Sequence, residues 1–249
     1  MTHSPMKIEE IKPYDDTGHK AEQVRQMFDS IAPAYDFMNR AMTLGIDRWW
    51  RKVAVRRISD ARPQTVLDVA TGTGDFAIRV LRDTKALHVT GIDLSEGMLA
   101  VARDKVKNAG LQEKITFARA DCLALPFNDN SFDAVTVAFG VRNFEDMARG
   151  YREMLRVLRP GGQLCVLELS VPQNRFIRFF YNIYAMHVIP TLGSLKSGDR
   201  NAYRYLPLSI AAVPQGEHMC EIMRQAGFSH ATARAMTLGV CSLYFATKD

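Results

Sequence analysis

The sequence of 249 residues has few cysteines, no hydrophobic run long enough to span a bilayer, and no internal repeat or low-complexity tract. Its four cysteines are far apart and form no Cys-x-x-Cys pair: Cys122, Cys165, Cys220 and Cys241. Neither a zinc site nor a disulfide framework is therefore expected, and we predict no bound metal and reduced cysteines that mostly fill the core. Acidic residues also occupy the place where a signal peptide would have its apolar segment. These absences predict a cytoplasmic protein.

What the sequence does contain is typical of a globular protein with a slight excess of positive charge. Hydrophobic residues make up 47% and charged residues 24%, which excludes disorder as the main state. Lys and Arg number 32 against 27 Asp and Glu, so the formal net charge is +5 and the pI is about 9.1. This balance favours an anionic partner. A nucleic acid, an acidic membrane surface and a charged cofactor all fit it.

Short apolar runs alternate with helical segments from residue 64 onward, which predicts an α/β fold with a largely parallel sheet and helices on both faces. Two further runs close the chain as an antiparallel hairpin around 237–239, which gives seven strands. Pro160-Gly161-Gly162 predicts a stop between a helix and the fifth strand. The predicted strands are 65–69, 86–92, 115–118, 134–139, 163–169, 231–236 and 240–247, and the predicted helices between them are 76–82, 96–109, 145–158 and 217–226.

The first 60 residues and the segment 171–215 lie outside this alternation. We predict a helix over 21–31, a turn at Ala32-Pro33-Ala34-Tyr35-Asp36, and a basic helix over 47–58 with Asp47 as its N-cap. The segment 171–215 is a long insertion after the fifth strand, and 216–249 holds the last helix and the hairpin.

A glycine loop follows the first predicted strand, in the sequence Asp68-Val69-Ala70-Thr71-Gly72-Thr73-Gly74-Asp75-Phe76-Ala77. Glycines here allow a tight turn and let a ligand lie against the backbone, and Asp93 follows the second strand at the offset of a ribose-binding acid. This pattern fits both a nicotinamide dinucleotide and S-adenosylmethionine. Asp68 and Asp75 on either side of the glycines favour the second, because a pyrophosphate avoids carboxylates whereas a sulfonium and an ammonium are attracted by them.

A dehydrogenase is further disfavoured by the only Tyr-x-x-x-Lys pattern, Tyr244 to Lys248, which falls in the last predicted strand and not on a helix. Asp121-Cys122 follows the third strand, where a side chain and a backbone N–H can address an adenine ring. With the glycine loop and Asp93, this layout resembles the class I S-adenosylmethionine-dependent methyltransferases from about residue 60 to the C-terminus, with a Rossmann-like fold.

A closer resemblance covers nearly the whole chain from about residue 20. The segments that carry it are Phe28 to Asn39, Leu44 to Trp50, Phe139-Gly140-Val141-Arg142-Asn143-Phe144, Gly193-Ser194-Leu195 and Tyr203-Arg204-Tyr205-Leu206. They are similar to the quinone-biosynthesis C-methyltransferases, the demethylmenaquinone and polyprenyl-benzoquinol methyltransferase family. This resemblance implies one methyltransferase domain over 1–249, with a helical substrate cap (1–60), a cofactor-binding half (61–170), an insertion or lid (171–215) and a C-terminal helix and hairpin (216–249).

The resemblance also implies which residues bind and react. Its cofactor positions correspond to Thr73, Asp93, Asp121 and Cys122, and we add the loop residues Asp68, Gly72 and Gly74 as cofactor-binding. Some members have a serine where this chain has Ala138. Methylation of a ring carbon requires the quinol hydroxyl to lose or share its proton. Arg142 is predicted to stabilise the phenolate or polarise a water, and Tyr35 to bind a ring oxygen or orient Arg142. An ion pair of Arg142 with Asp36 or Glu145 is the structural alternative.

The predicted substrate is a lipid-soluble polyprenyl quinol, with demethylmenaquinol first and a benzoquinol of ubiquinone biosynthesis as the alternative. Aromatic and aliphatic residues of the insertion would line a slot for the isoprenoid tail or pack as a lid: Phe176, Ile177, Phe179, Phe180, Tyr181, Ile183, Tyr184, Met186, Val188 and Ile189. His187 is a candidate acid or base, although a lone His in an apolar run more often packs.

Membrane contact and self-association are the remaining expectations. The basic helix 47–58, with Arg51, Lys52, Arg56 and Arg57, and the pair Arg175 and Arg178 are candidates for peripheral contact with an anionic membrane on its cytoplasmic face. A solvated helix face explains the same charges. A homo-oligomer is compatible with the sequence. A nucleic-acid methyltransferase is disfavoured because the fourth strand ends without an Asn/Asp-Pro-Pro-aromatic motif, so no nucleic-acid partner is expected. A non-catalytic binding protein stays open.

Overall fold

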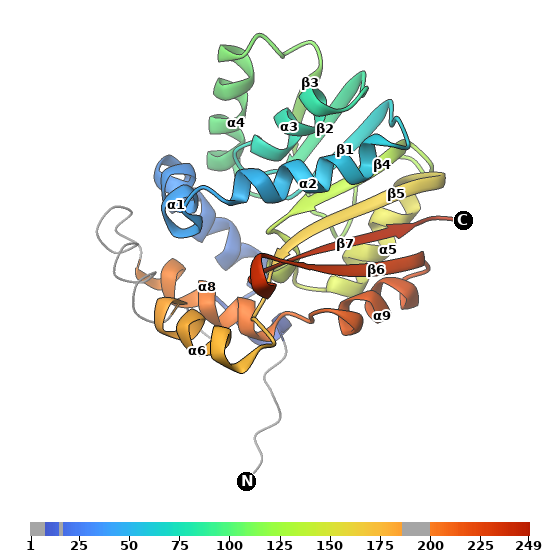
Figure 1. Ribbon diagram of the computed structural model, residues 1–249. Helices are drawn as coiled ribbons and strands as arrows, with labels where there is room; N and C mark the ends of the chain where they lie inside the picture. The colour runs from blue at the N-terminus through green and yellow to red at the C-terminus, as the bar shows by residue number, and fades with distance from the viewer. Residues whose placement is uncertain (1–7, 15–16, 186–199) are drawn as a thin grey trace.

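A seven-stranded sheet forms the centre of the computed structural model, which describes residues 8–14, 17–185 and 200–249 (Figure 1). The strands are β1 (Thr65–Val69), β2 (His88–Asp93), β3 (Ile115–Arg119), β4 (Phe132–Ala138), β5 (Leu158–Leu169), β6 (Ser229–Met236) and β7 (Cys241–Thr247). Their order is β3-β2-β1-β4-β5-β7-β6. β7 runs antiparallel to both neighbours, and the other pairs are parallel. The predicted fold class and the closing hairpin are confirmed.

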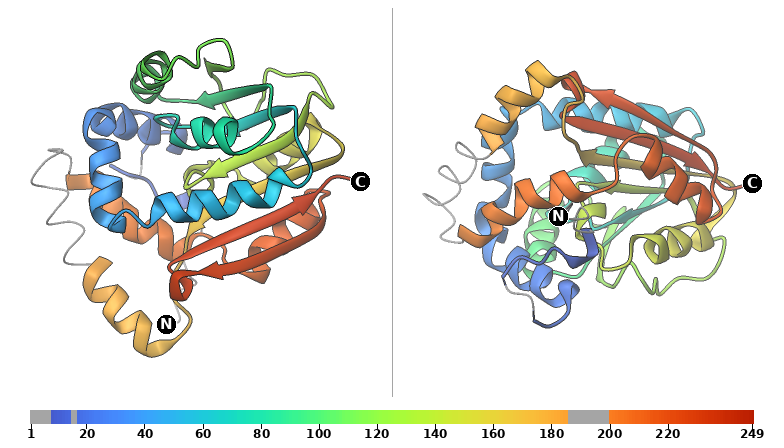
Figure 2. Two further views of the ribbon diagram at one scale, coloured as in Figure 1. Left: turned by 45° about the horizontal axis from the view of Figure 1, so that its top comes forward. Right: turned by 90° about the horizontal axis from the view of Figure 1, so that it is seen from below.

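Helices cover both faces of the sheet (Figure 2). Those in the described residues are α1 (Lys20–Thr43), α2 (Asp47–Ser59), α3 (Asp75–Asp83), α4 (Glu96–Asn108), α5 (Met147–Val157), α6 (Arg175–Ile183), α8 (Arg200–Ala212) and α9 (Glu217–Gln225). Short 3-10 turns are η1 (Ile8–Glu10), η2 (Val141–Asn143) and η4 (Thr237–Gly239). α2, α3 and α4 pack on one face, and α5 and α9 on the other.

Side chains of the central strands alternate between two hydrophobic cores, as expected for a sheet buried on both faces. In β5, Leu164 and Val166 join the core under α5 and α9, whereas Cys165 and Leu167 join the core under α2 and α3. All four cysteines are buried and unpaired. Their predicted place in the core is confirmed.

The fifth strand begins earlier than predicted. β5 starts at Leu158 directly after α5, and Pro160-Gly161-Gly162 lies inside the strand as an irregularity in its pairing with β4. Gly161 has a φ of +77° and its N–H donates to the carbonyl of Lys248 at 2.7 Å. The helix stop is therefore at Val157, and the Pro-Gly-Gly sequence forms a bulge that glycine permits.

α1 is continuous where the sequence predicts a turn at 32–36, so that prediction is wrong. Pro33 removes one backbone hydrogen bond from the helix, but tertiary bonds hold the helix on both sides of it. On one side the Asp29 carboxylate accepts from Ser95 Oγ at 2.6 Å, and on the other the Asp36 carboxylate accepts from Thr73 Oγ1 at 2.6 Å. Lys105 of α4 also pairs with Asp36. Contacts distant in sequence thus outweigh the local signal of proline.

α2 also differs from the prediction in two respects. Its N-cap is Ile46, and Asp47 is the first helical residue, where its buried carboxylate pairs with Arg51. Arg51 is itself buried, so it does not belong to a basic surface as predicted. Lys52, Arg56 and Arg57 are exposed, as expected.

No helix in the described ranges is long and apolar enough to cross a bilayer. The insertion contributes α6 and α8, which lie beside α1 at one end of the sheet (Figure 1). Met186, His187, Val188, Ile189 and the segment Gly193-Ser194-Leu195 lie outside the described residues.

Candidate active site

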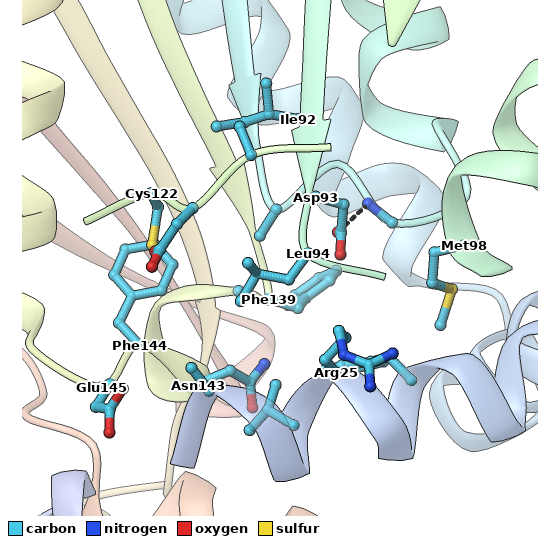
Figure 3. A pocket seen from close by; sticks show the side chains of 18 of the residues that line it. Arg25, Ile92, Asp93, Leu94, Met98, Cys122, Phe139, Asn143, Phe144 and Glu145 are labelled. Carbon is cyan, nitrogen blue, oxygen red and sulfur yellow. Dashed lines mark hydrogen bonds between the residues drawn. The ribbon is translucent and has the colours of Figure 1, made fainter. Parts of the chain in front are cut away.

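A narrow cleft of about 70 Å³ lies at the carboxyl ends of β1 to β4, where ligands of parallel sheets bind. Loops after these strands form one wall, and α1 forms the other with Val24, Arg25, Phe28 and Tyr35 (Figure 3). Of the predicted site residues, the cleft brings together Gly72, Asp93, Asp121, Cys122 and Tyr35. These come from four separate elements of the chain.

Asp93 is fixed at the end of β2 by two backbone amides. Its Oδ2 accepts from Gly72 N at 2.8 Å (Figure 3), and its Oδ1 accepts from Ser95 N at 2.9 Å. Burial raises the pKa of Asp93, and the hydrogen bonds from the amides oppose this rise. The carboxylate thus joins the glycine loop to the start of α4 and presents its remaining acceptor capacity to the cleft.

Asp121 and Cys122 follow β3 at the far side of the cleft. Asp121 Oδ1 accepts from Leu123 N at 2.9 Å, which stabilises the turn. The Cys122 thiol is buried, and its burial raises its pKa well above the usual value. A neutral thiol of this kind packs against a ligand and does not act as a nucleophile.

Thr73 and Gly74 of the glycine loop do not line the cleft. Thr73 Oγ1 donates to Asp36 at 2.6 Å and accepts from Lys105 Nζ at 3.0 Å, so the hydroxyl joins the loop to α1 and α4. Gly74 has a φ of +79°, which glycine adopts without strain. Both residues shape the loop behind the cleft.

Asp68 lies under the glycine loop and also stays outside the cleft. It is almost wholly buried, and its two oxygens accept from Thr71 Oγ1 and Thr136 Oγ1, each at 2.6 Å. Desolvation by burial raises its pKa to about 6, against the two hydroxyl hydrogen bonds. Its contacts fix β1, β4 and the loop to one another.

The charges around the cleft are mainly negative. Asp93, Asp121 and Glu145 line it together with one cation, Arg25, which is paired with Asp29 at 2.6 Å. Apolar side chains such as Ile92, Leu94 and Met98 cover the cleft near Asp93 (Figure 3). Carboxylates and flat apolar surfaces suit a ligand with a positive charge and an aromatic base, and they do not suit a pyrophosphate.

A second and much larger cavity, of about 540 Å³, lies between α1, α6, α8 and the start of α2. We call it the chamber. Its lining is apolar and aromatic, and Arg142 is the only charged side chain among the described residues that line it. From the insertion, Ile177, Phe180, Tyr181 and Tyr184 contribute to the lining, although Phe180 is also partly open to solvent (55% exposed), whereas Phe176, Phe179 and Ile183 are exposed and do not line it. The chamber suits a long apolar ligand with one polar end.

The cleft and the chamber share four lining residues: Phe28 and Tyr35 of α1, and Phe139 and Asn143 after β4. Phe139 has a φ of +61°, an unfavourable conformation for a bulky residue, and such strain is typical of functional sites. Gly140 beside it must be glycine, because a Cβ there would lie 2.6 Å from the Cβ of Ala70. A group in the cleft and a group in the chamber can therefore meet at this shared wall.

Arg142 lies in η2, buried against Glu168 of β5 and not paired with Asp36 or Glu145. Its Nη1 donates to Glu168 Oε1 at 2.7 Å and to the carbonyl of Phe139. Its Nε is buried and has no hydrogen-bond partner within the described part of the chain. The charge of Glu168 raises the pKa of Arg142 although burial acts to lower it. Arg142 is thus a permanently charged donor at the polar end of the chamber.

Tyrosines surround this polar end. Burial raises the pKa of Tyr35, and the charge of Arg142 acts in the opposite direction, as it does at Tyr181 and Tyr205. Tyr205 of α8 donates its hydroxyl to Asn143 Oδ1 at 3.1 Å. Tyr35 and Arg142 therefore both line the chamber, within a cluster of neutral phenols, and their predicted roles stay a prediction.

Sequence reasoning missed Glu168, Asn143 and Tyr205. Glu168 had a usable signal, because it is the only charged residue in the apolar run 163–169, and an isolated buried carboxylate requires a buried cation. Asn143 stands next to Arg142 in a segment that carried the family resemblance. Nothing in the pattern around Tyr205 indicated that it would reach Asn143.

Known proteins give a consistent comparison. A model of the ubiE/COQ5 methyltransferase family matches residues 16–248. The demethylmenaquinone methyltransferase of Bacteroides fragilis is 54% identical over 240 residues, which cover 96% of this chain and 98% of that protein. The enzyme of the same name from Porphyromonas gingivalis is 48% identical over 241 residues, with 96% and 98% covered.

A solved structure of similar fold is a SAM-dependent methyltransferase from Thermotoga maritima, with a TM-score of 0.59 and 18% identity. The match covers 90% of this chain and 100% of that one. At this identity the likeness concerns the fold. The described residues contain no group of three or more His, Cys, Asp or Glu side chains placed to hold a metal ion.

Proposed function

The chain belongs to the ubiE/COQ5 methyltransferase family, and on this premise we propose that it transfers the methyl group of S-adenosylmethionine to a ring carbon of demethylmenaquinol. The observation that carries this proposal is the wall shared by the two cavities. A cleft with carboxylates and a large apolar chamber meet at Phe28, Tyr35, Phe139 and Asn143. Methyl transfer requires donor and acceptor to meet in line while each keeps its own binding surface.

The residues of the cleft fit S-adenosylmethionine. Asp93, held by two backbone amides, would accept from the ribose hydroxyls, and Asp121 and Cys122 would border the adenine. A Cβ added at Gly72 would meet no atom within 4 Å, so the loop leaves space for a ligand against its backbone. The bound cofactor supplies an electrophilic methyl group on a sulfonium. Thr73, Gly74 and Asp68 support this binding by holding the loop.

The chamber residues would prepare the quinol. Arg142 has a buried Nε without a partner in the described part of the chain, and a quinol oxygen placed there gains a charge-assisted hydrogen bond as it loses its proton. Tyr35 and Asn143 lie on the wall where the ring carbon would face the methyl group. The quinol hydroxyl would give its proton to water, and the new carbon–carbon bond would form as the carbon–sulfur bond breaks. The methylated ring carbon would then give its proton to water as the ring regains aromaticity, and the ring oxygen would take up a proton again, so that one proton is released overall.

The other segments would control access. α1 and α2 form the cap, since α1 lines both cavities, and α6 and α8 of the insertion close the chamber. The isoprenoid tail would lie along Ile177, Phe180 and Tyr184, where burial of apolar surface stabilises binding by about 25 cal/mol per Å².

We further propose that the chamber opens toward a membrane that holds the substrate. Three segments line the chamber and also expose large apolar side chains: Leu44 between α1 and α2 is 89% exposed, Phe176 of α6 72% and Leu238 of η4 72%. We call these segments, residues 40–52, 170–183 and 234–243, the rim. The only acidic residue of the rim is Asp47, which is buried and paired with Arg51, whereas Arg48, Lys52, Arg175 and Arg178 are exposed. An apolar surface with surrounding cations fits anionic lipid.

Incubation with labelled S-adenosylmethionine tests the catalytic proposal. The purified protein is offered demethylmenaquinol, an unmethylated polyprenyl benzoquinol or transfer RNA, and products are identified by mass spectrometry. We expect label in menaquinol, with less in the benzoquinol product. Label in RNA alone, or in no product, would overturn the proposal.

Flotation with vesicles of phosphatidylglycerol and phosphatidylcholine tests the rim. Phe176→Ser combined with Leu238→Ser should reduce the bound fraction severalfold, and added salt should reduce it further. Leu87→Ser is the matched control, because Leu87 is equally exposed (67%) at the opposite end of the sheet. If both variants bind the vesicles equally well, the proposal that the rim binds a membrane is wrong. If the double variant differs from wild type in molecular mass by light scattering, these residues mediate self-association instead.

A further inference from the structure

Glu168 is a buried carboxylate that accepts three hydrogen bonds, two of them from Arg142. Its Oε1 accepts from Arg142 Nη1 at 2.7 Å and from Leu169 N at 2.9 Å, and its Oε2 accepts from the backbone N–H of Arg142 at 3.2 Å. One side chain therefore fixes both the guanidinium and the peptide of the same arginine. It does so from the carboxyl end of β5, a rigid element of the sheet.

Glu168 does not itself reach a ligand. It lines neither the cleft nor the chamber, and its two oxygens are engaged in the three hydrogen bonds just described. A carboxylate held in this way is poorly placed to take a proton from a ring hydroxyl, because such a base must approach to about 2.6–3.2 Å. Its influence on a reaction can only pass through Arg142.

The arginine in turn keeps a buried donor available. Nη1 is occupied by Glu168 and by the carbonyl of Phe139, whereas the buried Nε has no partner in the described residues. A buried donor without a partner is costly, so it marks the position of a ligand acceptor. Because Glu168 binds Nη1, it determines in which direction the Nε–H of the planar guanidinium points.

We propose that Glu168 is a positioning residue for methyl transfer, which holds the guanidinium of Arg142 so that its Nε faces the oxygen of the ring that is methylated. The inference rests on the proposed function. It assigns no contact with substrate to Glu168 and explains why a carboxylate stands in the run 163–169, which is otherwise uncharged.

Glu168→Gln is the variant that tests the proposal with the least change of shape. The amide oxygen can still accept from Arg142 Nη1, but the amide NH₂ then faces the N–H of Arg142, donor against donor. We expect kcat with demethylmenaquinol to fall by about tenfold or more, and S-adenosylmethionine affinity by calorimetry to change less than about twofold. Retained cofactor binding shows that the variant is folded.

Glu153→Gln is the matched control. Glu153 of α5 also binds an arginine, Arg156 at 2.8 Å, and also accepts from a backbone amide, Leu125 N at 2.8 Å, but it lines neither cavity. The chemical change is the same, and kcat should stay within about twofold of wild type. If Glu168→Gln lowers kcat no more than this control does, Glu168 is only structural and the proposal is wrong.

A double-mutant cycle separates positioning from direct catalysis. If Glu168 acts only through Arg142, Arg142→Gln combined with Glu168→Gln loses no more activity than Arg142→Gln alone. A further loss of tenfold in the double variant would show that Glu168 acts independently, and would overturn the proposal.

Binding of 1-naphthol gives a readout without turnover. Its fluorescence is followed with S-adenosylhomocysteine present. The affinity should fall in Glu168→Gln and at least as far in Arg142→Gln, and the double variant should bind no more weakly than Arg142→Gln. If the variants lose naphthol affinity in this way but the wild-type protein methylates no quinol, the proposed function is refuted and the positioning role of Glu168 is still supported. Unchanged naphthol affinity in all three variants would refute the positioning role.

Discussion

The cleft and the chamber meet at Tyr35, but they are built from different kinds of structure. Loops at the ends of parallel strands form much of the cleft and present carboxylates held by backbone amides, as at Asp93. Helices from distant parts of the sequence form the chamber, with apolar side chains and one guanidinium. A small charged cofactor is fixed by a few directed hydrogen bonds, whereas a large apolar substrate is fixed by burial and one polar anchor.

The largest effect should follow from loss of the polar anchor of the chamber. Arg142→Gln should lower kcat by about 10²–10³-fold, the usual effect of removing one donor to a developing negative charge. The affinity for S-adenosylmethionine should stay unchanged, because Arg142 does not line the cleft. Steady-state kinetics and calorimetry on the same preparation check both statements. Weaker cofactor binding would show that the two cavities are not separate in function.

The second largest effect concerns Asp68 and the pH dependence of stability. Its pKa is raised by burial to about 6 from the usual 3.8, so the folded state holds this proton more tightly than the unfolded state. Stability from this group is complete below about pH 4 and is lost as the pH rises to 6, by about 3 kcal/mol. Asp68→Asn should remove that pH dependence.

Urea denaturation of wild type and Asp68→Asn at pH 4, 5, 6 and 7 measures the difference. Cofactor affinity at pH 7 should change little, since Asp68 lies behind the cleft. If the variant loses cofactor binding while the pH dependence of its stability is the same as in wild type, Asp68 binds the cofactor as the sequence predicts and does more than hold the loop.

A smaller effect on affinity is expected at Asp93. Asp93→Ala should weaken S-adenosylmethionine binding by about 10–100-fold, because a hydrogen bond to a charged group contributes about 1.5–3 kcal/mol. Binding of 1-naphthol without cofactor should be unaffected. Asp83→Ala is the control, since Asp83 pairs with Arg79 on the surface of α3 and lines neither cavity.

The smallest effect should come from the wall between the cavities. Gly140→Ala places a Cβ 2.6 Å from that of Ala70, and crowding of this kind costs about 1–3 kcal/mol. Thermal unfolding should therefore occur at a lower temperature. Ala70→Gly in the same chain should restore stability, because it removes the opposing Cβ at a residue whose φ is +51°. If Ala70→Gly does not restore the unfolding temperature, the contact between the two Cβ atoms is not what destabilises Gly140→Ala.

The fold and the cleft were largely predictable, whereas the chamber was predictable only in part. Strand alternation gave the parallel sheet, and the carboxyl edge of that sheet brings Gly72, Asp93 and Asp121 together for topological reasons. Chamber residues lie on helices, and a helix period indicates one apolar face without indicating what it faces. Phe176 and Phe180 are both apolar residues of α6, yet only Phe180 lines the chamber.

Local patterns failed where distant contacts decide the structure. Pro33 predicts a turn, but bonds of Asp29 and Asp36 to other segments keep α1 helical. Thr73 and Asp68 belong to a recognisable loop motif, but their side chains are engaged with Asp36 and with two threonines behind the cleft. A motif identifies the loop, and packing determines which of its side chains face a ligand.

The continuity of α1 through Pro33 has an energetic consequence. The helix is hydrogen-bonded to the glycine loop through Asp36 and to the N-cap of α4 through Asp29. The same helix lines the chamber with Met27, Ile31 and Met38. If cofactor binding shifts α1, the shift therefore also changes the binding free energy of the quinol. By thermodynamic linkage the effect is reciprocal, so that each ligand changes the affinity for the other by the same factor.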